Sequence, residues 1–232
     1  MSELIVHQYR VSPFAAKVRR ACYYKELDFE TRNLSTADLS AIKKMSPSGK
    51  TPVLEHKGRF IVDSTDIIRY LDDNFKARPL IPENPLQRAQ AHIYEDWADE
   101  SLYFYDLTMR SWPNNSALLG ADLVMDERKS WRKKLFKSLM PKLILKQAGP
   151  QGIARKSHEV VCREAACQFD AIDAISQQQE YLVGSQLSVA DIAVASMCTV
   201  LERAEEANAL MNDRPALMAW RARIDAMTLP AG

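Results

Sequence analysis

The segment YRVSPF, residues 9–14, places two hydroxyl groups where a helix is expected to begin. Serine suits the N-cap and proline suits the first helical position, so Ser12 and Pro13 together are typical of a helix start. The same end of a helix favours negative charge, because its dipole and its free N–H groups point there. Ser12 is therefore either a simple cap, which is the commoner role, or a hydroxyl that does chemistry at the positive end of a helix.

A second segment of interest is Thr51-Pro52, which stands at the entrance of an expected strand, TPVLEH. Proline forfeits a ladder hydrogen bond, so one interpretation is an edge strand or the first residue of a strand. The other is a cis proline that turns the main chain of Thr51 outward, where an extended peptide can pair with it as an added strand. Both interpretations fit the dipeptide.

Asp63 and Ser64 form the third segment, immediately before another expected helix. Capping alone would justify both residues. As a binding site, a hydroxyl and free N–H groups at a helix start would hold a carboxylate, while an aspartate would hold an ammonium group. An α-amino acid headgroup carries both charges, so it is the ligand that this pair would suit.

The elements that position these segments follow from hydrophobic periodicity and turn residues. Strands are expected at 4–9 and 28–34, a hairpin around Lys57-Gly58, and helices at 13–25, 36–45 and 64–75. The order βαβαββα predicts a mixed sheet with helices on its faces, which we assign to a domain spanning 1–78.

The rest of the chain shows helical periods and no convincing strand. A proline-rich linker is expected at 79–85, followed by an all-α domain at 86–232. The helices are expected at 86–110, 121–146, 157–178, 188–207 and 214–227.

Composition limits the kinds of partner. The 232 residues carry a formal net charge of +1, which gives no general electrostatic reason to bind nucleic acid or an anionic membrane. The four cysteines form no C-x-x-C pair and have no histidines at metal-ligand spacing, so neither a disulfide framework nor a metal site is expected. With no signal peptide and no long apolar run, we expect a soluble cytoplasmic protein.

One stretch of the chain departs from this near-neutral charge. Between Arg128 and His158 there are ten lysines and arginines and no acid, with Trp131 and Phe136 interleaved. Such a segment either contacts an anionic partner or is a solvated helix face whose side chains cover apolar neighbours. A nucleic acid partner is the less expected of these.

Taken together, the motifs resemble the cytosolic glutathione transferase superfamily. They are SPFAAKVRRACYYKELDFE, SPSGKTPVLEHKGRFIVDSTDIIRYLDDNF, YLVGSQLSVADIAVASMCTVL and RPALMAWRARIDAM, in the order and spacing of that family. The resemblance implies a thioredoxin-like glutathione-binding domain followed by a helical domain, glutathione as co-substrate, and a homodimer. The region 108–158 matches no motif of the family.

Carried over by position, the resemblance implies a glutathione site. Thr51, before cis Pro52, would pair its main chain with the cysteinyl part, and Lys50 would meet a carboxylate. Asp63 and Ser64 would hold the γ-glutamyl ammonium and carboxylate, although glutamate is more usual than aspartate at position 63.

The resemblance also implies the residues around the sulfur. Ser12 would face it, with Tyr9 as a rival, because tyrosine-type members keep a phenol near that place. Pro13 and Phe14 would line a hydrophobic substrate pocket between the domains. A hydroxyl that donates to the thiolate at a helix start lowers the thiol pKa and so supplies the nucleophile.

Three functions follow from this resemblance. The first is a transferase that conjugates glutathione to a hydrophobic electrophile or uses it to reduce one. The second is a non-catalytic regulatory or binding protein that uses the segment 128–158. The third is an isomerase or dehalogenase that needs glutathione.

Overall fold

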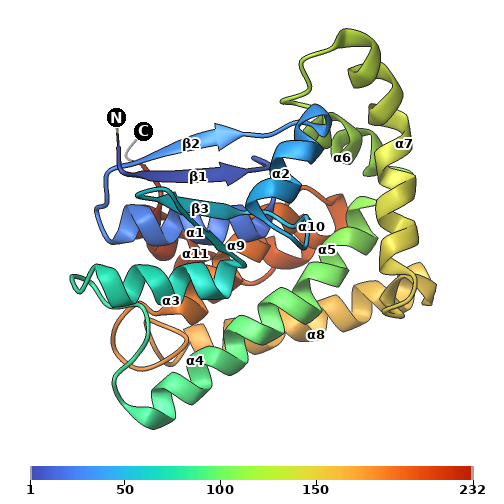
Figure 1. The fold of residues 1–232 in the computed structure, drawn as a ribbon. Helices are drawn as coiled ribbons and strands as arrows, with labels where there is room; N and C mark the ends of the chain where they lie inside the picture. The colour runs from blue at the N-terminus through green and yellow to red at the C-terminus, as the bar shows by residue number, and fades with distance from the viewer. Residues whose placement is uncertain (1, 231–232) are drawn as a thin grey trace.

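The N-terminal part of the chain forms a four-stranded mixed sheet, in a computed structural model that describes residues 2–230 (Figure 1). The ends of the two expected domains, residues 1 and 231–232, lie outside the described residues. The strands are β1 (Leu4–Gln8), β2 (Phe29–Asn33), β3 (Val53–His56) and β4 (Arg59–Val62), in the order β2-β1-β3-β4. β1 is parallel to β2 and antiparallel to β3, which pairs with β4 in a hairpin.

The turn of this hairpin has the chemistry that its sequence predicts. Lys57 and Gly58 both have positive φ, 51° and 77°, as the two-residue hairpin turn that matches strand twist requires. Pro52 lies just before β3, so its missing N–H removes no bond from the ladder.

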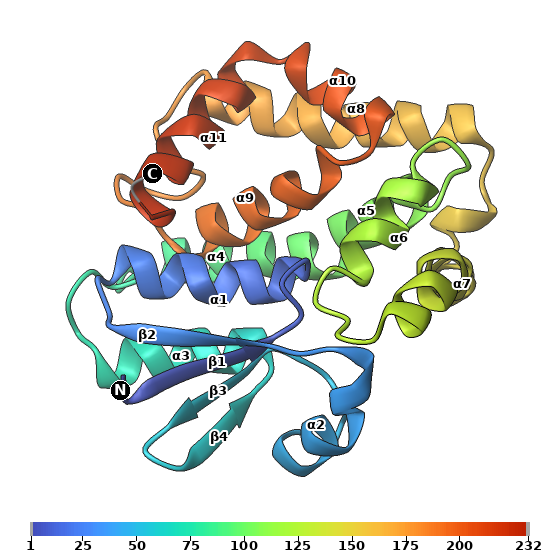
Figure 2. The ribbon, with the colours of Figure 1, turned by 90° about the horizontal axis from the view of Figure 1, so that it is seen from above.

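Three helices accompany the sheet: α1 (Pro13–Tyr24), α2 (Leu39–Met45), which follows a short 3-10 turn (Thr36–Asp38), and α3 (Ser64–Asn74). Helix α1 lies between the sheet and the helical domain, as Figure 2 shows. It can fill this place because Ala15, Val18, Ala21 and Cys22 are fully buried along it.

The second domain is entirely helical between residues 85 and 230. A continuous helical stretch comprises α4 (Pro85–Trp97), a π-helical turn (Ala98–Leu102) and α5 (Tyr103–Arg110). The later elements are α6 (Ser116–Leu123), α7 (Ser130–Ala148), a 3-10 turn (Ile153–Arg155), α8 (His158–Ser176), α9 (Val189–Leu201), α10 (Glu205–Asn212) and α11 (Pro215–Thr228).

The predicted limits of two helices are wrong. The helix predicted at 121–146 is two helices, because the chain leaves α6 at Val124 and runs to the N-terminal domain, where Asp126 pairs with Arg10 (2.7 Å), before α7 begins. The helix predicted at 188–207 ends at Leu201. There the Arg203 side chain turns to Asp122 of α6, with an Nη2–Oδ1 distance of 2.6 Å.

Helix α9 lies in the interior of the molecule and packs against both α1 and α4 (Figure 2). All its residues except Thr199 are buried, which agrees with its alanine- and valine-rich sequence. None of the helices within residues 2–230 is long and apolar enough to cross a membrane.

Candidate functional site

The strand register gathers the three chemistry-bearing segments at one end of the sheet. Val53 pairs with His7 of β1 on one side and with Val62 of β4 on the other. The residues that follow β1, precede β3 and follow β4 therefore meet at the same end. These residues are the segments 9–14, 51–52 and 63–64.

Ser12 is the N-cap of α1, and its hydroxyl oxygen accepts a hydrogen bond from the Ala15 N–H at 3.4 Å. Its own N–H donates to the Tyr9 carbonyl at 3.0 Å, which closes a tight turn between β1 and the helix. Because the hydroxyl only accepts from the helix, its proton stays available for another acceptor. Capping and chemistry at Ser12 are thus compatible.

Tyr9 lies in a different electrostatic setting. Its half-buried phenol has a pKa raised above the ordinary value, first by burial and then by the charges of Asp38 and Glu127. Those carboxylates are held there because Glu127 pairs with Thr36 and Asp38 caps its own 3-10 turn. Two nearby negative charges oppose a third, so a thiolate is disfavoured beside Tyr9 and favoured beside Ser12.

The Thr51–Pro52 peptide bond is cis, as the second interpretation of the sequence requires. The N–H and C=O of Thr51 make no hydrogen bond to another residue between 2 and 230. Lys50 is exposed in the loop before it, after Gly49, whose φ of 70° turns the chain. The main chain of Thr51 is therefore free to pair with a ligand.

Asp63 caps α3 with an unusual backbone. Its φ is 73°, rare for a residue other than glycine, and its carboxylate accepts from the Thr65 N–H at 2.9 Å. Ser64, the first residue of α3, is buried beside it. Strained residues of this kind gather at functional sites.

A buried lysine was not found by sequence reasoning. Lys17, one turn into α1, has a side chain only 1% exposed, and its ammonium donates to Glu95 Oε1 at 2.9 Å and Asp99 Oδ2 at 2.5 Å. It also reaches the Thr65 hydroxyl at 3.4 Å, next to the α3 cap. Lys17 lies three residues after Phe14, which places it toward the inward face of the helix, but this spacing does not identify the partners that allow its burial.

Asp99 is the weak acid of this cluster. Burial raises its pKa to about 6, against the opposing pull of Lys17, and Glu95 and Asp63 raise it further. Its second oxygen, Oδ1, is buried and has no hydrogen-bond partner among the described residues. The α3 cap thus borders a carboxylate that retains one unused acceptor.

Pro13 and Phe14 face the helical domain. Pro13 is buried, and the Phe14 ring lies 4.8 Å from that of Tyr103, centroid to centroid. Burial first, and then the charges of Asp106 and Glu100, raise the pKa of Tyr103 to about 12. Its hydroxyl has no hydrogen-bond partner within residues 2–230, so it is a protonated donor beside an apolar wall.

Family models match most of this architecture. The model described as "Glutathione S-transferase, N-terminal domain" matches residues 6–79, and "Glutathione S-transferase, C-terminal domain" matches 139–227. The chain belongs to the glutathione transferase superfamily, which confirms the resemblance and the fold class predicted from the sequence.

Individual relatives agree with this family. Glutathione S-transferase U22 of Arabidopsis thaliana is 34% identical over 104 residues, 44% of this chain and 48% of the relative, so the chain matches about half its length. Protein LigF of Sphingobium is 27% identical over 218 residues, 88% of this chain and 82% of the relative.

Solved structures show the same fold. The beta-etherase LigF from Sphingobium superposes with a TM-score of 0.70 at 23% identity, covering 97% of this chain and 95% of that one. Rice GST1, solved in complex with glutathione, gives 0.67 at 24% identity, with coverage of 99% and 92%.

Proposed function

We propose that this protein is a glutathione transferase in which Ser12 activates the glutathione thiol for attack on an electrophilic carbon. The observation that carries the proposal is the Ser12 hydroxyl. It caps α1 through its oxygen and keeps its proton for a thiolate, at the end of the sheet where the Thr51 main chain is unpaired. Glutathione as the ligand is supported by the family and by relatives solved with it bound.

The remaining groups suit the rest of glutathione. The main chain of Thr51 would pair with the cysteinyl residue as an added strand, with Pro52 cis behind it. Lys50, exposed in the adjoining loop, would meet a carboxylate. The N-terminus of α3 at Ser64 would accept the γ-glutamyl carboxylate, and Asp63 would take the ammonium group.

The gain from Ser12 is a larger fraction of thiolate. A cysteine thiol of pKa about 8.5 is mostly protonated at neutral pH, and the thiolate is the nucleophile. A hydrogen bond from Ser12 together with the α1 dipole lowers that pKa, and two units correspond to about 2.7 kcal/mol. Tyr9 is the weaker candidate because Asp38 and Glu127 place negative charge beside it.

The electrophile we propose is a carbon that bears an oxygen leaving group, in an ether or an epoxide. Two relatives that match most of the chain carry such names: LigF, called a beta-etherase, and the isoprene-epoxide glutathione S-transferase of Rhodococcus, 25% identical over 195 residues. The thiolate sulfur forms the C–S bond, the C–O bond breaks, and the departing oxygen takes up a proton. Tyr103, protonated and beside Phe14, is the proposed donor.

Activity with 1-chloro-2,4-dinitrobenzene tests the thiol activator. We expect Ser12→Ala to lower kcat/KM by about 100-fold, equivalent to about 2.7 kcal/mol, and Tyr9→Phe to lower it less than threefold. The reverse pattern would transfer the role to Tyr9. Binding of glutathione by the wild type without any turnover would instead favour the regulatory alternative. No thermal shift with millimolar glutathione would count against the transferase but not against that alternative, which uses the segment 128–158.

The leaving group separates Tyr103 from Ser12. Chloride departs without a proton, whereas an alkoxide needs one, so Tyr103→Phe should slow an epoxide or aryl ether substrate by about 10- to 100-fold and leave the chloro substrate unchanged. Equal losses with both substrates would mean that Tyr103 supports the pocket only and donates no proton.

A further inference from the structure

A cysteine, a histidine and a glutamate form a hydrogen-bonded cluster where the start of α8 meets the start of α10. Cys162 Sγ lies 3.8 Å from Nδ1 of His158, one helical turn earlier, and His158 Nε2 lies 3.2 Å from Glu206 Oε1. No residue of the proposed glutathione site takes part in these contacts. A thiol, an imidazole and a carboxylate in this order are the groups of a nucleophile, its base and the residue that orients the base.

Glu206 is held in place by two asparagines that lie between α5 and α6. Asn115 Nδ2 donates to its Oε2 at 2.7 Å, and Asn114 Nδ2 donates to its Oε1 at 2.9 Å. Burial raises the pKa of Glu206, but the hydrogen bonds that it accepts outweigh burial and leave this pKa below the ordinary value. Glu206 is therefore an ionised carboxylate at neutral pH, fixed beside the imidazole of His158.

The carboxylate determines which nitrogen of His158 carries the proton. Because an ionised carboxylate can only accept, the neutral imidazole donates from Nε2 to Glu206. Nδ1 is then the unprotonated nitrogen, and it is the one that faces the Cys162 thiol. The thiol therefore lies beside a nitrogen that can take its proton, and Glu206 would stabilise the imidazolium that results.

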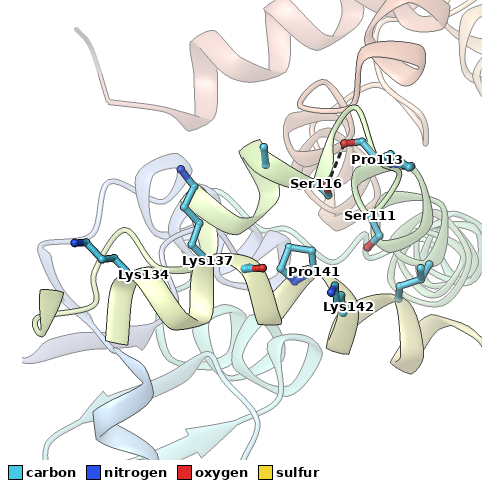
Figure 3. Close-up of a pocket in the computed structure, with 10 residues that line it drawn as sticks. Ser111, Pro113, Ser116, Lys134, Lys137, Pro141 and Lys142 are labelled. Carbon is cyan, nitrogen blue, oxygen red and sulfur yellow. Dashed lines mark hydrogen bonds between the residues drawn. The ribbon is translucent and has the colours of Figure 1, made fainter. Parts of the chain in front are cut away.

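The imidazole ring is also held from its face. The Trp112 ring stacks on it, with ring centroids 4.0 Å apart and an angle of 33° between the planes. Ser111 and Pro113, the neighbours of Trp112 in the chain, line the pocket drawn in Figure 3, whereas Trp112 does not line it. The His158 side chain is 59% exposed, so the stack and the bond to Glu206 are what limit its rotation.

Cys162 is half-buried, and its thiol needs a base before it can react. Burial first, and then the charge of Glu206, raise the pKa of this thiol above the ordinary value. The thiol is therefore protonated at neutral pH, and the attacking thiolate has to form by transfer of the proton to His158. Cys167, five residues later on α8, is more exposed but has no histidine partner among residues 2–230.

We propose that Cys162 is a second nucleophilic centre, which adds to small neutral α,β-unsaturated carbonyl compounds with His158 as its base and Glu206 as a positioning residue. The sulfur forms a bond to the β-carbon, the π bond of the alkene breaks, and the thiol proton passes through His158 Nδ1 to the α-carbon. This compound class suits the cluster because the imidazole that takes the proton can return it to carbon, so no further reactant is needed. The negative charge of Glu206 favours a neutral compound over an anionic one. The site is independent of the proposed transferase activity.

Alkylation by N-ethylmaleimide, a neutral α,β-unsaturated carbonyl compound, tests the site. Peptide mass spectrometry measures the rate separately at the two cysteines of α8, so Cys167 is a reference within the same molecule. At pH 7 we expect Cys162 to react about fivefold faster than Cys167, although it is the less exposed of the two. A slower reaction at Cys162 than at Cys167 would overturn the proposal.

His158→Gln removes the base from an exposed position, so the fold should persist, as circular dichroism would show. We expect alkylation of Cys162 to slow by about 10-fold, with the rate at Cys167 changed by less than about twofold. His92→Gln, at an exposed position in α4, is the matched control and should leave both rates unchanged. An unchanged rate at Cys162 in His158→Gln would also overturn the proposal.

Glu206→Gln separates two opposite effects of this carboxylate on the thiol. Its charge raises the thiol pKa, so its removal would speed alkylation of Cys162 if that were its only role. As the partner of His158 it stabilises the imidazolium, so its removal should slow alkylation, and we expect a loss of about threefold. Glu205→Gln removes the neighbouring charge, which has no hydrogen bond to His158, and should change the rate by less than about 1.5-fold. Faster alkylation in Glu206→Gln, or equal slowing in both variants, would contradict the proposed role of Glu206.

Discussion

Helices α1 and α9 pack against each other, and each begins with a serine, yet the two serines are used differently. Ser188 belongs to a closed capping box, in which its N–H and hydroxyl both donate to Asp191, at 3.0 Å and 3.2 Å. Asp191 is fully buried and also accepts from the Leu182 N–H and the Trp220 indole. Ser12 has a single long side-chain bond and a free proton.

This difference separates a cap that is complete within the fold from one that leaves a proton for a ligand. A cap whose donors and acceptors are all satisfied within the fold fixes a helix and has nothing left for a ligand. A partly exposed cap with a free proton contributes less to stability than a fully bonded one. The unused hydroxyl proton is what makes Ser12 a candidate for chemistry. The sequence motif alone, a serine at a helix start, is the same in both.

The largest predicted effect tests the closed cap. Asp191→Ala leaves the Leu182 and Ser188 N–H groups and the Trp220 indole buried without an acceptor, each at a cost of about 1–3 kcal/mol. We expect the free energy of unfolding to fall by about 4 kcal/mol in urea titrations. Asp213→Ala, at an exposed position, is the control, and a loss below about 1 kcal/mol for Asp191→Ala would contradict the assignment.

The second effect concerns Lys17, which distinguishes α1 from the apolar α9. Lys17→Met leaves the Glu95 and Asp99 carboxylates together in a buried place without a cation, and we expect a loss of about 3 kcal/mol. Lys44→Met, at an exposed position in α2, should change stability by less than about 0.5 kcal/mol.

Neutralising the carboxylates should rescue that variant. Adding E95Q and D99N to Lys17→Met removes the uncompensated charges, so at least half of the lost free energy should return. A triple variant as unstable as the single one would attribute the loss to packing of the lysine stem.

The third effect is the pH dependence of Asp99. Its folded pKa of about 6 lies above its ordinary value, so between the two the folded state binds more protons, and stability falls as pH rises. Asp99→Asn cannot ionise. Relative to wild type it should therefore gain roughly 1 kcal/mol between pH 5 and pH 7, as urea unfolding at both values would show. A difference that stays constant with pH would refute the raised pKa.

The smallest effect is the stability of the open cap. Ser12→Ala removes only a 3.4 Å cap bond, so it should cost less than about 1 kcal/mol, near the low end for N-cap substitutions. Ser188→Ala should cost more, because its oxygen and its donors are buried. If Ser12→Ala proved the more damaging to stability, its hydroxyl would be a structural cap and the contrast between the two helices would disappear.

Local signals predicted much of this molecule. The Lys57-Gly58 hairpin, the βαβαββα order of elements along the chain and the helix starts at Ser12, Asp63 and Ser188 depend on residues close in sequence, and all are present. The roles of Ser12, Lys50, Thr51, Asp63 and Ser64 toward glutathione, and the domain limits at 78 and 86, stay predictions.

What sequence reasoning missed depends on distant contacts. The single helix expected at 188–207 is broken where Arg203 reaches Asp122, and Glu205 begins the next helix by donating its N–H to Asn115. Lys17 is buried because its partners come from a helix some eighty residues later in the chain. Hydrophobic periodicity carries no information about such pairings.

The buried cations of α1 also determine how the two domains unfold. Lys17 depends on Glu95, and Arg20, nearly inaccessible to solvent, donates to Thr199 at 2.9 Å and Thr228 at 2.6 Å, all in the helical domain. If either domain unfolded first, the buried side chains of Lys17 and Arg20 would lose their hydrogen-bond partners in the other domain. We therefore expect the two domains to unfold as one cooperative unit, with a single melting transition in calorimetry.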